Sequence, residues 1–393
     1  MLKWQPAKTK TAKRVNKQLQ LGDELDLEIT DLNSKGEGVG KHKRQVLFVP
    51  GAWLGEHVRV RIVELKKSYV QAEVVSILQA SDARRDAPCP YHGVNDKTCG
   101  GCPWMFIDYV AQVHAKQRRV EEMCSRLGLD CPGTIQASPQ ELAYRNRAQL
   151  KASADALGFV AARSDQIVDV EQCVVLSDHN NALLGRIREQ DLGIGRRRKT
   201  WVTIDIADEV DFEHISFNQR LPFRQGNTAQ NQKMLSWLER VLSERDSKQA
   251  LELFAGSGNL TQALVASGVD DITVVEVVPE ALDALRQTLP SSKAFALDLF
   301  DKTKLSELVS LSTGADLLLL DPPRDGFAML GELVSQLPSL KTIIYISCDL
   351  ASFERDVAAL RNEFTLLELQ PLDMYPQTPH VELMSVWLRR VER

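Results

Sequence analysis

Two patterns of apolar and polar positions divide the chain. Between residues 18 and 78, short segments alternate apolar and polar residues, as in LDLEITDL, QVLFVPGA, HVRVRIVEL and YVQAEVVSIL. Alternation with a period of two is typical of strands with one buried face. Gly36, Gly38 and Gly40 let the chain turn tightly between the first two segments. These features predict a small closed barrel of the OB type, a fold that commonly binds RNA or single strands.

The last part of the chain alternates apolar strands with amphipathic helices. ALELFAG, ITVVEVV, KAFALDL, DLLLLDPP and KTIIYIS are separated by segments such as PEALDALRQTL and ASFERDVAALRN. This alternation predicts a doubly wound α/β domain with a mostly parallel sheet. We therefore expect four regions: a basic tail at 1–17, the barrel at 18–80, a mixed α/β central domain at 81–215 and the doubly wound domain at 216–393.

The pattern of apolar residues is least informative in the central region, residues 81–215. A helix is expected near residues 107–127, and strand-like segments such as RAQLKASADALGFVAAR and TWVTIDIA follow it. The pattern does not give the order of these strands.

Composition narrows the class of protein. The 393 residues are too many for one typical domain, and no apolar run approaches the roughly 18 residues of a membrane helix. The N-terminus is basic without an apolar core, so it is not a secretory signal, and we expect a cytoplasmic monomer with no membrane partner. Net charge is −5, but local patches decide nucleic-acid binding. Two basic clusters, six cations within residues 1–17 and Arg196–Lys199, are read equally well as RNA contacts or as solvated segments.

The first three strands of the doubly wound domain end in residues suited to a nucleotide-like ligand. LELFAGSGNLT runs from a strand through Gly256 and Gly258 into a helix, which lets a ligand approach the backbone. Glu276 ends the next strand, where an acid typically accepts hydrogen bonds from ribose hydroxyls, and Asp298 follows the third strand. The pattern resembles the S-adenosylmethionine site of Rossmann-like methyltransferases; a nicotinamide dehydrogenase is the competing interpretation.

The fourth strand favours the methyltransferase. It ends in Asp321-Pro-Pro-Arg324, a stiff turn with a carboxylate at the sheet edge where open α/β sheets bind substrates. Enzymes that methylate amino groups often have an aromatic residue where Arg324 stands. The target atom is therefore expected to be a different one.

The fifth strand ends in a lone cysteine, Cys348, in YISCD. A thiolate that adds to C6 of uracil makes C5 nucleophilic, and a base must then remove the C5 proton so that the thiol can leave. We expect the start of the following helix to lower the pKa of this thiol. Glu382 in PHVELMSVW is the candidate base, because a carboxylate entering an apolar strand is costly without a function or a partner. His380 is read as an ordinary loop histidine.

Taken together, LELFAGSGNLT, LDPPRDG, YISCD and HVELM resemble, in order, the motifs of the RNA uridine-5-methyltransferase family. The resemblance covers nearly the whole chain, and PFRQGNTAQNQKML is similar to the segment that enters the family's catalytic domain. It implies Cys348 as nucleophile and Glu382 as base. It also implies that S-adenosylmethionine is bound by Gln225, Phe254, Asn259, Glu276, Asp298 and Asp321.

The predicted barrel resembles a TRAM domain, an RNA-binding module of some members, through GEGVGKHKRQVLFVPGAWLGEHVRVRIVE. Members with this barrel and a cysteine cluster more often resemble 23S rRNA enzymes than tRNA enzymes. We therefore expect RNA as the partner, and we favour 23S rRNA over tRNA.

Seven cysteines, unevenly spread, do not form a secreted disulfide scaffold. Cys89, Cys99 and Cys102 crowd together in a metal or redox spacing, and with Cys173 they are similar to the family's four-cysteine [4Fe–4S] site. Zinc is the alternative, and a thioredoxin-like CxxC a third interpretation. We expect a structural cluster. Cys124 is read as helix core and Cys131 as loop.

Two further functions compete. A non-catalytic RNA-binding protein would not need Cys348 and Glu382. A 5-methylcytosine enzyme usually carries a second cysteine in the fourth-strand motif, where this chain has Asp321-Pro-Pro-Arg324.

Overall fold

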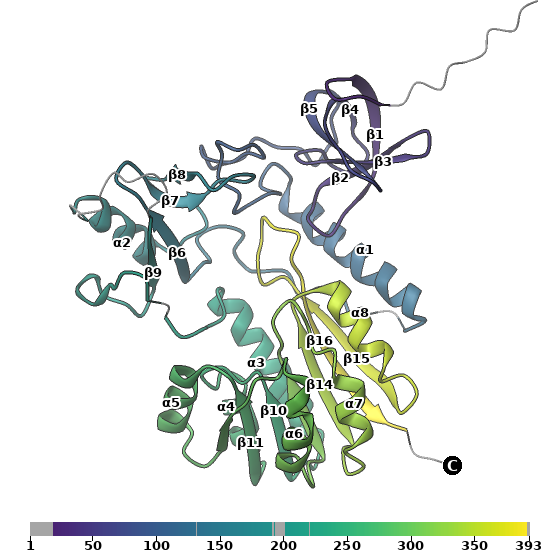
Figure 1. The fold of residues 1–393 in the computed structure, drawn as a ribbon, viewed down its shortest axis with the longest axis vertical. Helices are drawn as coiled ribbons and strands as arrows, with labels where there is room; N and C mark the ends of the chain where they lie inside the picture. The colour runs from purple at the N-terminus through teal and green to yellow at the C-terminus, as the bar shows by residue number, and fades with distance from the viewer. Residues whose placement is uncertain (1–18, 131, 191, 193–200, 220, 391–393) are drawn as a thin grey trace, which may run out of the picture. The chain divides into compact units, whose positions relative to one another are not determined.

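The computed structural model describes residues 19–130, 132–190, 192, 201–219 and 221–390, which form two compact units divided between Asp82 and Ala83 (Figure 1). The basic tail at 1–17, the Arg196–Lys199 cluster and Cys131 lie outside the described residues. Among the helices that the structure describes, none combines the length and the apolar character needed to span a bilayer.

The first unit is a closed five-stranded barrel, which confirms the expected barrel fold. Its strands follow the order β1-β2-β3-β5-β4 around the barrel. Gly36 is in the left-handed region, with φ of 78°, and makes the expected turn. Gly40 has another role, because a Cβ there would lie 2.6 Å from the Leu27 side chain inside the barrel. The strands are β1 (Glu24–Leu32), β2 (Gly38–His42), β3 (Gln45–Val49), β4 (His57–Leu65) and β5 (Val70–Gln79).

The second unit begins with a long helix and a small antiparallel sheet. Helix α1 (Tyr109–Leu127) starts where the Asp108 side chain accepts a hydrogen bond from Val110 N and ends at left-handed Gly128. Cys124 is buried in its apolar face, as expected. The sheet order is β8-β7-β6-β9, which the sequence pattern did not give. The sheet and its helix comprise β6 (Arg147–Ala152), β7 (Leu157–Val160), β8 (Ile167–Asp169), α2 (Asp178–Arg188) and β9 (Val202–Ala207).

A seven-stranded sheet dominates the rest of this unit. Its order is β12-β11-β10-β13-β14-β16-β15, parallel except at β16, which runs antiparallel to both of its neighbours. This mostly parallel sheet was expected from the alternating pattern. The strands are β10 (Gln249–Leu253), β11 (Asp271–Glu276), β12 (Lys293–Ala296), β13 (Leu317–Leu320), β14 (Thr342–Ser347), β15 (Phe364–Leu372) and β16 (Glu382–Arg389).

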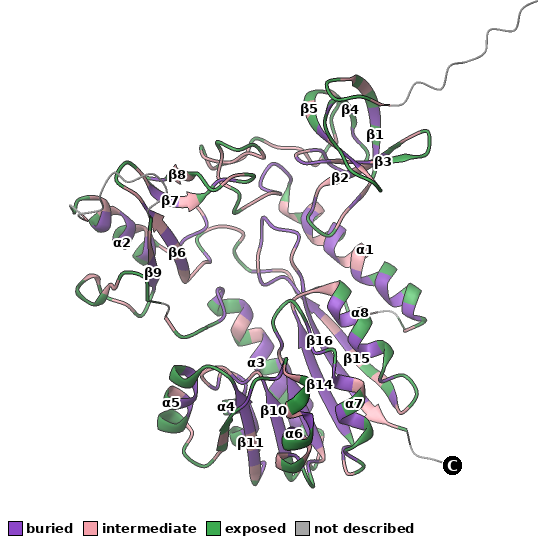
Figure 2. Cartoon of the chain, in the orientation of Figure 1, coloured by how far each residue is buried: buried purple, intermediate pink, exposed green. Residues whose placement is uncertain are grey.

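Apolar helices cover both faces of this sheet. Residues of α1, α6, α7 and α8 share one core with alternate positions of β13, and residues of α3, α4 and α5 share another core with the remaining positions. The central strands are accordingly buried along their length (Figure 2). The helices are α3 (Thr228–Ser243), α4 (Thr261–Ala266), α5 (Pro279–Thr288), α6 (Leu305–Leu311), α7 (Leu330–Ser335) and α8 (Leu350–Ala358), with short 3₁₀ turns at Phe212–His214 and Lys302–Lys304.

Candidate active site

The predicted site residues follow the carboxyl ends of adjacent parallel strands. Phe254 comes directly after β10, Glu276 ends β11, Asp321 comes directly after β13 and Cys348 directly after β14. These four strands are neighbours in the sheet, so their ends share one edge. Asp298 lies two residues beyond the end of β12 and is exposed. The edge is the usual ligand-binding side of an open α/β sheet.

The antiparallel register of β14 and β16 brings Cys348 and Glu382 together. Ser347 pairs with Leu383, and the same register continued by one residue sets Cys348 opposite Glu382. The Glu382 side chain is 4% exposed, and its pKa is raised by burial, with the nearby Asp321 carboxylate adding to the rise. The thiol of Cys348 and the buried carboxylate of Glu382 therefore lie opposite each other on neighbouring strands, and the raised pKa makes this carboxylate a stronger base than usual.

The Cys348 thiol does not have the lowered pKa that we expected. Burial, reinforced by the carboxylates of Glu382 and Asp321, raises its pKa to about 12, and Arg324 only partly opposes this. The helix start gives no compensation because Asp349 caps it, accepting hydrogen bonds of 2.9 Å from Ala351 N and Ser352 N. The cap and the buried acids together outweigh the expected effect of the helix dipole on the thiol pKa.

Arg324 and His380 form a polar contact beside this pair. The Arg324 Nη2 atom lies 3.0 Å from His380 Nε2. Burial and the cations of Arg324, Lys116 and Arg119 lower the His380 pKa to about 4, so the imidazole is neutral near pH 7 and Nε2 accepts from the guanidinium. His380 lies in the loop before β16, as expected, but its contact with Arg324 was not predicted.

Residues expected to bind the cofactor converge on the same edge. The Gln225 Nε2 atom lies 3.4 Å from Asp321 Oδ2, and Asn259 exchanges side-chain hydrogen bonds of 3.0 Å with Asn231. Phe254 adopts an unusual left-handed φ of 60°, and its ring packs edge-on against Phe327 at 5.7 Å. A strained backbone at a strand end is characteristic of a functional site.

Glu276 and the glycine loop beside it leave room for a ligand. The Glu276 carboxylate accepts hydrogen bonds from the backbone N–H groups of Gly256, Val277 and Val278. A carboxylate offers about four lone-pair sites, so capacity remains for a hydroxyl donor. A Cβ added to Gly256 would meet nothing within 4 Å, which marks open space over the loop.

Two families match the sequence. The tRNA (uracil-5-)-methyltransferase family matches residues 175–391, and the TRAM domain matches residues 18–75. The chain belongs to the tRNA (uracil-5-)-methyltransferase family. Its expected fold class, a class I methyltransferase sheet with a TRAM barrel, and its resemblance to uridine-5-methyltransferases are both confirmed.

Relatives over the full length agree with this family. An uncharacterised RNA methyltransferase of Nitrosomonas europaea is 36% identical over 378 residues, covering 92% of this chain and 95% of that protein. A 23S rRNA (uracil(1939)-C5)-methyltransferase of Shewanella denitrificans is 28% identical, covering 95% of this chain and 98% of that protein.

A solved structure shows the same fold. The tRNA (uracil-54, C5)-methyltransferase of Pyrococcus abyssi, in complex with S-adenosyl-L-homocysteine, superposes with a TM-score of 0.68 at 19% identity. The match covers 93% of this chain and 100% of that one. The two proteins therefore share their fold at low sequence identity.

The four cysteines expected to bind a cluster come near one another in this family member. Cys89, Cys102 and Cys173 pack against one small apolar cluster formed by Met105, Tyr144 and Val175. Burial raises the pKa of Cys99 to about 11, and the thiols of Cys173 and Cys89 contribute to that rise. Within the described ranges, however, no group of three or more histidine, cysteine or acidic side chains is arranged as a metal site.

Sequence reasoning missed the supports of the site. Lys116 and Asp373 form an ion pair between α1 and the loop before Glu382, and both side chains are fully buried. Tyr375, in the same loop, has its pKa raised to about 12 by burial and by the Glu382 carboxylate, which places the phenol near the base. No local sequence pattern indicates contacts between residues so distant in the sequence.

Proposed function

We propose that this protein methylates C5 of uridine in RNA, with S-adenosylmethionine as methyl donor, Cys348 as nucleophile and Glu382 as base. The observation that carries the proposal is the β14–β16 register, which, continued by one residue, sets Cys348 opposite Glu382 at the edge where the parallel strands end. A thiol alone cannot complete the reaction, because the C5 proton must leave before the thiol does.

The chain's own residues divide the chemistry. Cys348 first loses its thiol proton, and the thiolate Sγ then forms a bond to C6 of uracil while the electron pair of the C5–C6 double bond moves toward the O4 carbonyl. S-adenosylmethionine, when bound, would supply an electrophilic methyl group at this edge. C5 of uracil would form a bond to that methyl group as the sulfonium–methyl bond breaks, with the neutral thioether as leaving group. Glu382 then takes the C5 proton, the C5–C6 double bond forms again and the Cys348–C6 bond breaks. Its raised pKa makes Glu382 a stronger base than an exposed carboxylate, which suits this step near neutral pH.

We propose that the cofactor residues predicted from sequence act at this edge. We assign ribose contacts to Glu276, whose carboxylate keeps an acceptor site, and the methionine end to Gln225 and Asp321, which contact each other beside Cys348. Phe254, Asn259 and Asp298 complete the proposed set, with exposed Asp298 suited to reading an adenine amino group.

We infer that the substrate is 23S rRNA rather than tRNA. Support comes from several full-length relatives named as 23S rRNA (uracil-C5)-methyltransferases, including those of Shewanella denitrificans and Thiobacillus denitrificans. The matched TRAM barrel is the proposed RNA-binding module. A cytoplasmic location and a monomeric state stay predictions.

A [4Fe–4S] cluster held by Cys89, Cys99, Cys102 and Cys173 is also part of the proposal. What supports it is the donor set: four thiols near one another, with the cationic Arg145 close to Cys99, Cys102 and Cys173. Elemental analysis of protein purified without oxygen should find iron and acid-labile sulfide, both lost in Cys102→Ser. A finding of zinc without sulfide would show a zinc site instead of an iron–sulfur cluster.

Methyl transfer to defined RNAs tests the function. Protein is incubated with methyl-labelled S-adenosylmethionine and either 23S rRNA or tRNA transcripts, and the digested nucleosides are separated. We expect labelled 5-methyluridine from 23S rRNA and none with Cys348→Ala. Label in tRNA alone would keep the chemistry and change the substrate, whereas RNA binding without label would favour a non-catalytic RNA-binding protein.

A further inference from the structure

The loop that leads into Glu382 is held by one face of a helix distant in sequence. Residues 373–381 connect β15 to β16 and carry His380. Four polar side chains of α1 reach this loop, and they contact its Asp373 carboxylate, its Gln377 side chain and its backbone. They are Tyr109, Gln112, Lys116 and Arg119, which recur every three to four residues and therefore line one face of the helix.

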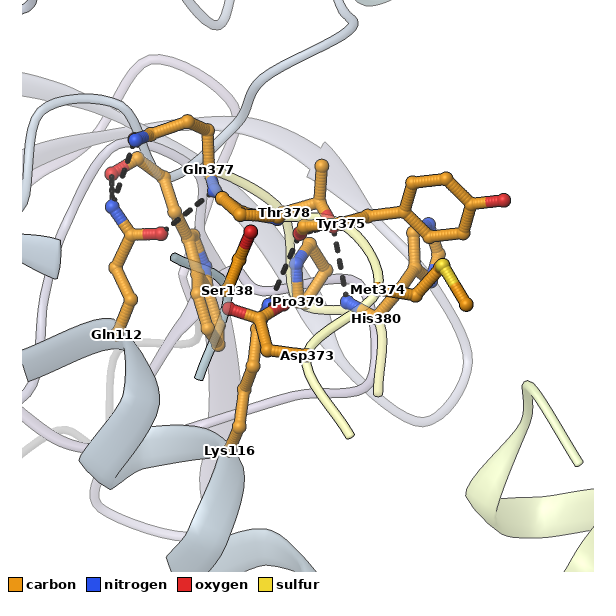
Figure 3. Close-up of polar contacts among 12 residues, drawn as sticks. Gln112, Lys116, Ser138, Asp373, Met374, Tyr375, Gln377, Thr378, Pro379 and His380 are labelled. Atoms are coloured by element: carbon orange, nitrogen blue, oxygen red, sulfur yellow. Dashed lines mark hydrogen bonds and ion pairs between the residues drawn. The ribbon is translucent and has the colours of Figure 1, made fainter. Parts of the chain in front are cut away.

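The first anchor lies at the start of the loop. Lys116 Nζ lies 2.5 Å from Asp373 Oδ1 and donates to the Tyr375 carbonyl at 3.1 Å (Figure 3). Tyr109 donates its hydroxyl to the other Asp373 oxygen at 2.8 Å. The Lys116 and Asp373 side chains are 0% exposed. The carboxylate is thus satisfied from two turns of the same helix.

The second and third anchors lie nearer to Glu382. Gln112 and Gln377 exchange two hydrogen bonds of 2.9 Å, one between their side chains and one from Gln377 N (Figure 3). Arg119 Nη1 donates to the Pro379 carbonyl at 2.7 Å, three residues before the base. Side chains from successive turns of α1 therefore hold the start, the middle and the end of the loop between them.

The stability of the fold does not explain this arrangement. A buried ion pair gives little net stability, because the desolvation of both charges offsets their attraction. What it supplies is geometry, since a displaced loop would leave a buried charge without its partner. The loop has no regular structure of its own, yet it must deliver Glu382 to within proton-transfer distance of C5.

We propose that Tyr109, Gln112, Lys116 and Arg119 are positioning residues that place Glu382 for removal of the C5 proton. This inference rests on the proposed function and adds the residues that govern its last step, removal of the C5 proton. A loosened loop slows proton removal more than thiol addition or methyl transfer. The covalent Cys348–RNA intermediate, already methylated, then accumulates with ordinary uridine.

The test compares Arg119→Gln with Arg118→Gln. Both remove one positive charge from adjacent positions of α1, but Arg118 pairs with Glu122 along the helix at 3.0 Å, whereas Arg119 reaches the loop. With saturating RNA and methyl-labelled cofactor, a denaturing gel separates the labelled protein–RNA adduct from the released RNA. We expect Arg119→Gln to lower turnover by roughly tenfold to a hundredfold and to accumulate labelled adduct. Arg118→Gln should behave like the wild type.

Two further variants make each outcome decisive. Tyr109→Phe removes the hydroxyl that donates to the Asp373 carboxylate, and it replaces Arg119→Gln in the test if that variant fails to fold. We expect Tyr109→Phe to accumulate labelled adduct, but less than Arg119→Gln. Glu382→Gln should accumulate the most adduct. If Glu382→Gln accumulates adduct but Arg119→Gln and Tyr109→Phe accumulate no more than Arg118→Gln, only the positioning proposal is overturned. No adduct in Glu382→Gln would overturn the assignment of the base itself.

Discussion

At the residue scale, the environment of Cys348 determines when the nucleophile forms. Burial and the neighbouring carboxylates of Glu382 and Asp321 raise the pKa of the thiol and keep it protonated in the free protein, and Arg324 opposes them in part. A cationic sulfonium brought to the same edge would act in the opposite direction, since a nearby positive charge favours the thiolate. The nucleophile is therefore expected to form only after the methyl donor has bound.

Alkylation of Cys348 checks this order. We expect the pH midpoint for iodoacetamide modification to fall by about 1 to 3 units with S-adenosylmethionine bound, because an opposite charge within a few ångströms shifts a pKa by that much. S-adenosylhomocysteine, whose sulfur is uncharged, should give a smaller shift at equal occupancy. Peptide mass spectrometry identifies the modified cysteine. Equal midpoints for the two ligands would show that the sulfonium charge does not control the thiol.

Glu252 gives a second prediction at this scale. It is buried within β10, one of its carboxylate oxygens has no hydrogen-bond partner among the described residues, and burial raises its pKa to about 8. Because the folded form holds a proton that the unfolded chain releases, this group lowers stability progressively as the pH rises from about 4.5 to 8. Glu252→Gln removes that penalty.

Chemical denaturation at two pH values measures the effect. The variant and the wild type should differ little near pH 5, and the variant should gain about 1 to 3 kcal/mol in free energy of unfolding at pH 8. A constant difference at both pH values would show that Glu252 keeps an ordinary pKa.

At the element scale, helix α8 holds the loop that follows β13. Its buried Asp356 accepts hydrogen bonds from Phe327 N at 2.6 Å and from the Tyr345 hydroxyl at 2.7 Å. One side chain thus joins α8 and β14 to the loop that carries Arg324, in the same way that α1 holds the loop before Glu382. Both loops of the candidate site are held by helices packed against the same face of the sheet.

Replacing Asp356 should uncouple this support. Asp356→Ala removes the partner of the half-exposed Arg355 and leaves two buried donors, Phe327 N and the Tyr345 hydroxyl, without one. A loss of about 2 to 4 kcal/mol in free energy of unfolding is expected. Asp356→Asn keeps the shape and one acceptor oxygen, so it should lose less. Thermal or denaturant unfolding of both variants measures the difference. Equal losses would indicate that packing around the side chain, and not its hydrogen bonds, holds the loop.

At the scale of the whole molecule, the sequence predicted what repeats locally and missed what depends on distant contacts. The barrel, the parallel strands and the residues at their ends follow from period-two and strand–helix patterns. The Lys116–Asp373 pair joins positions 257 residues apart, and no pattern in one sequence reports such a contact. The raised pKa of Cys348 was missed for the same reason, because its causes come from three different strand ends.

The barrel gives a prediction for RNA affinity. Lys41 and Arg44 are exposed at the turn between β2 and β3. If both contact phosphates, replacing them by Gln should weaken RNA binding uniformly and reduce the slope of log K against log salt by about 1.4, at roughly 0.7 per cation on single strands. Turnover at saturating RNA should stay unchanged. An unaltered salt slope would place the RNA on another face of the barrel.

Covalent trapping tests the central claim most directly. The protein is mixed with S-adenosylmethionine and 23S rRNA in which 5-fluorouridine replaces uridine, and the digested complex is analysed by mass spectrometry. Fluorine at C5 cannot leave as a proton, so the reaction should stop after methyl transfer with the nucleotide bound to the enzyme. We predict an adduct on Cys348 that carries the transferred methyl group, and none in Cys348→Ala. Methyl transfer to uridine that persists in Cys348→Ala would contradict the account.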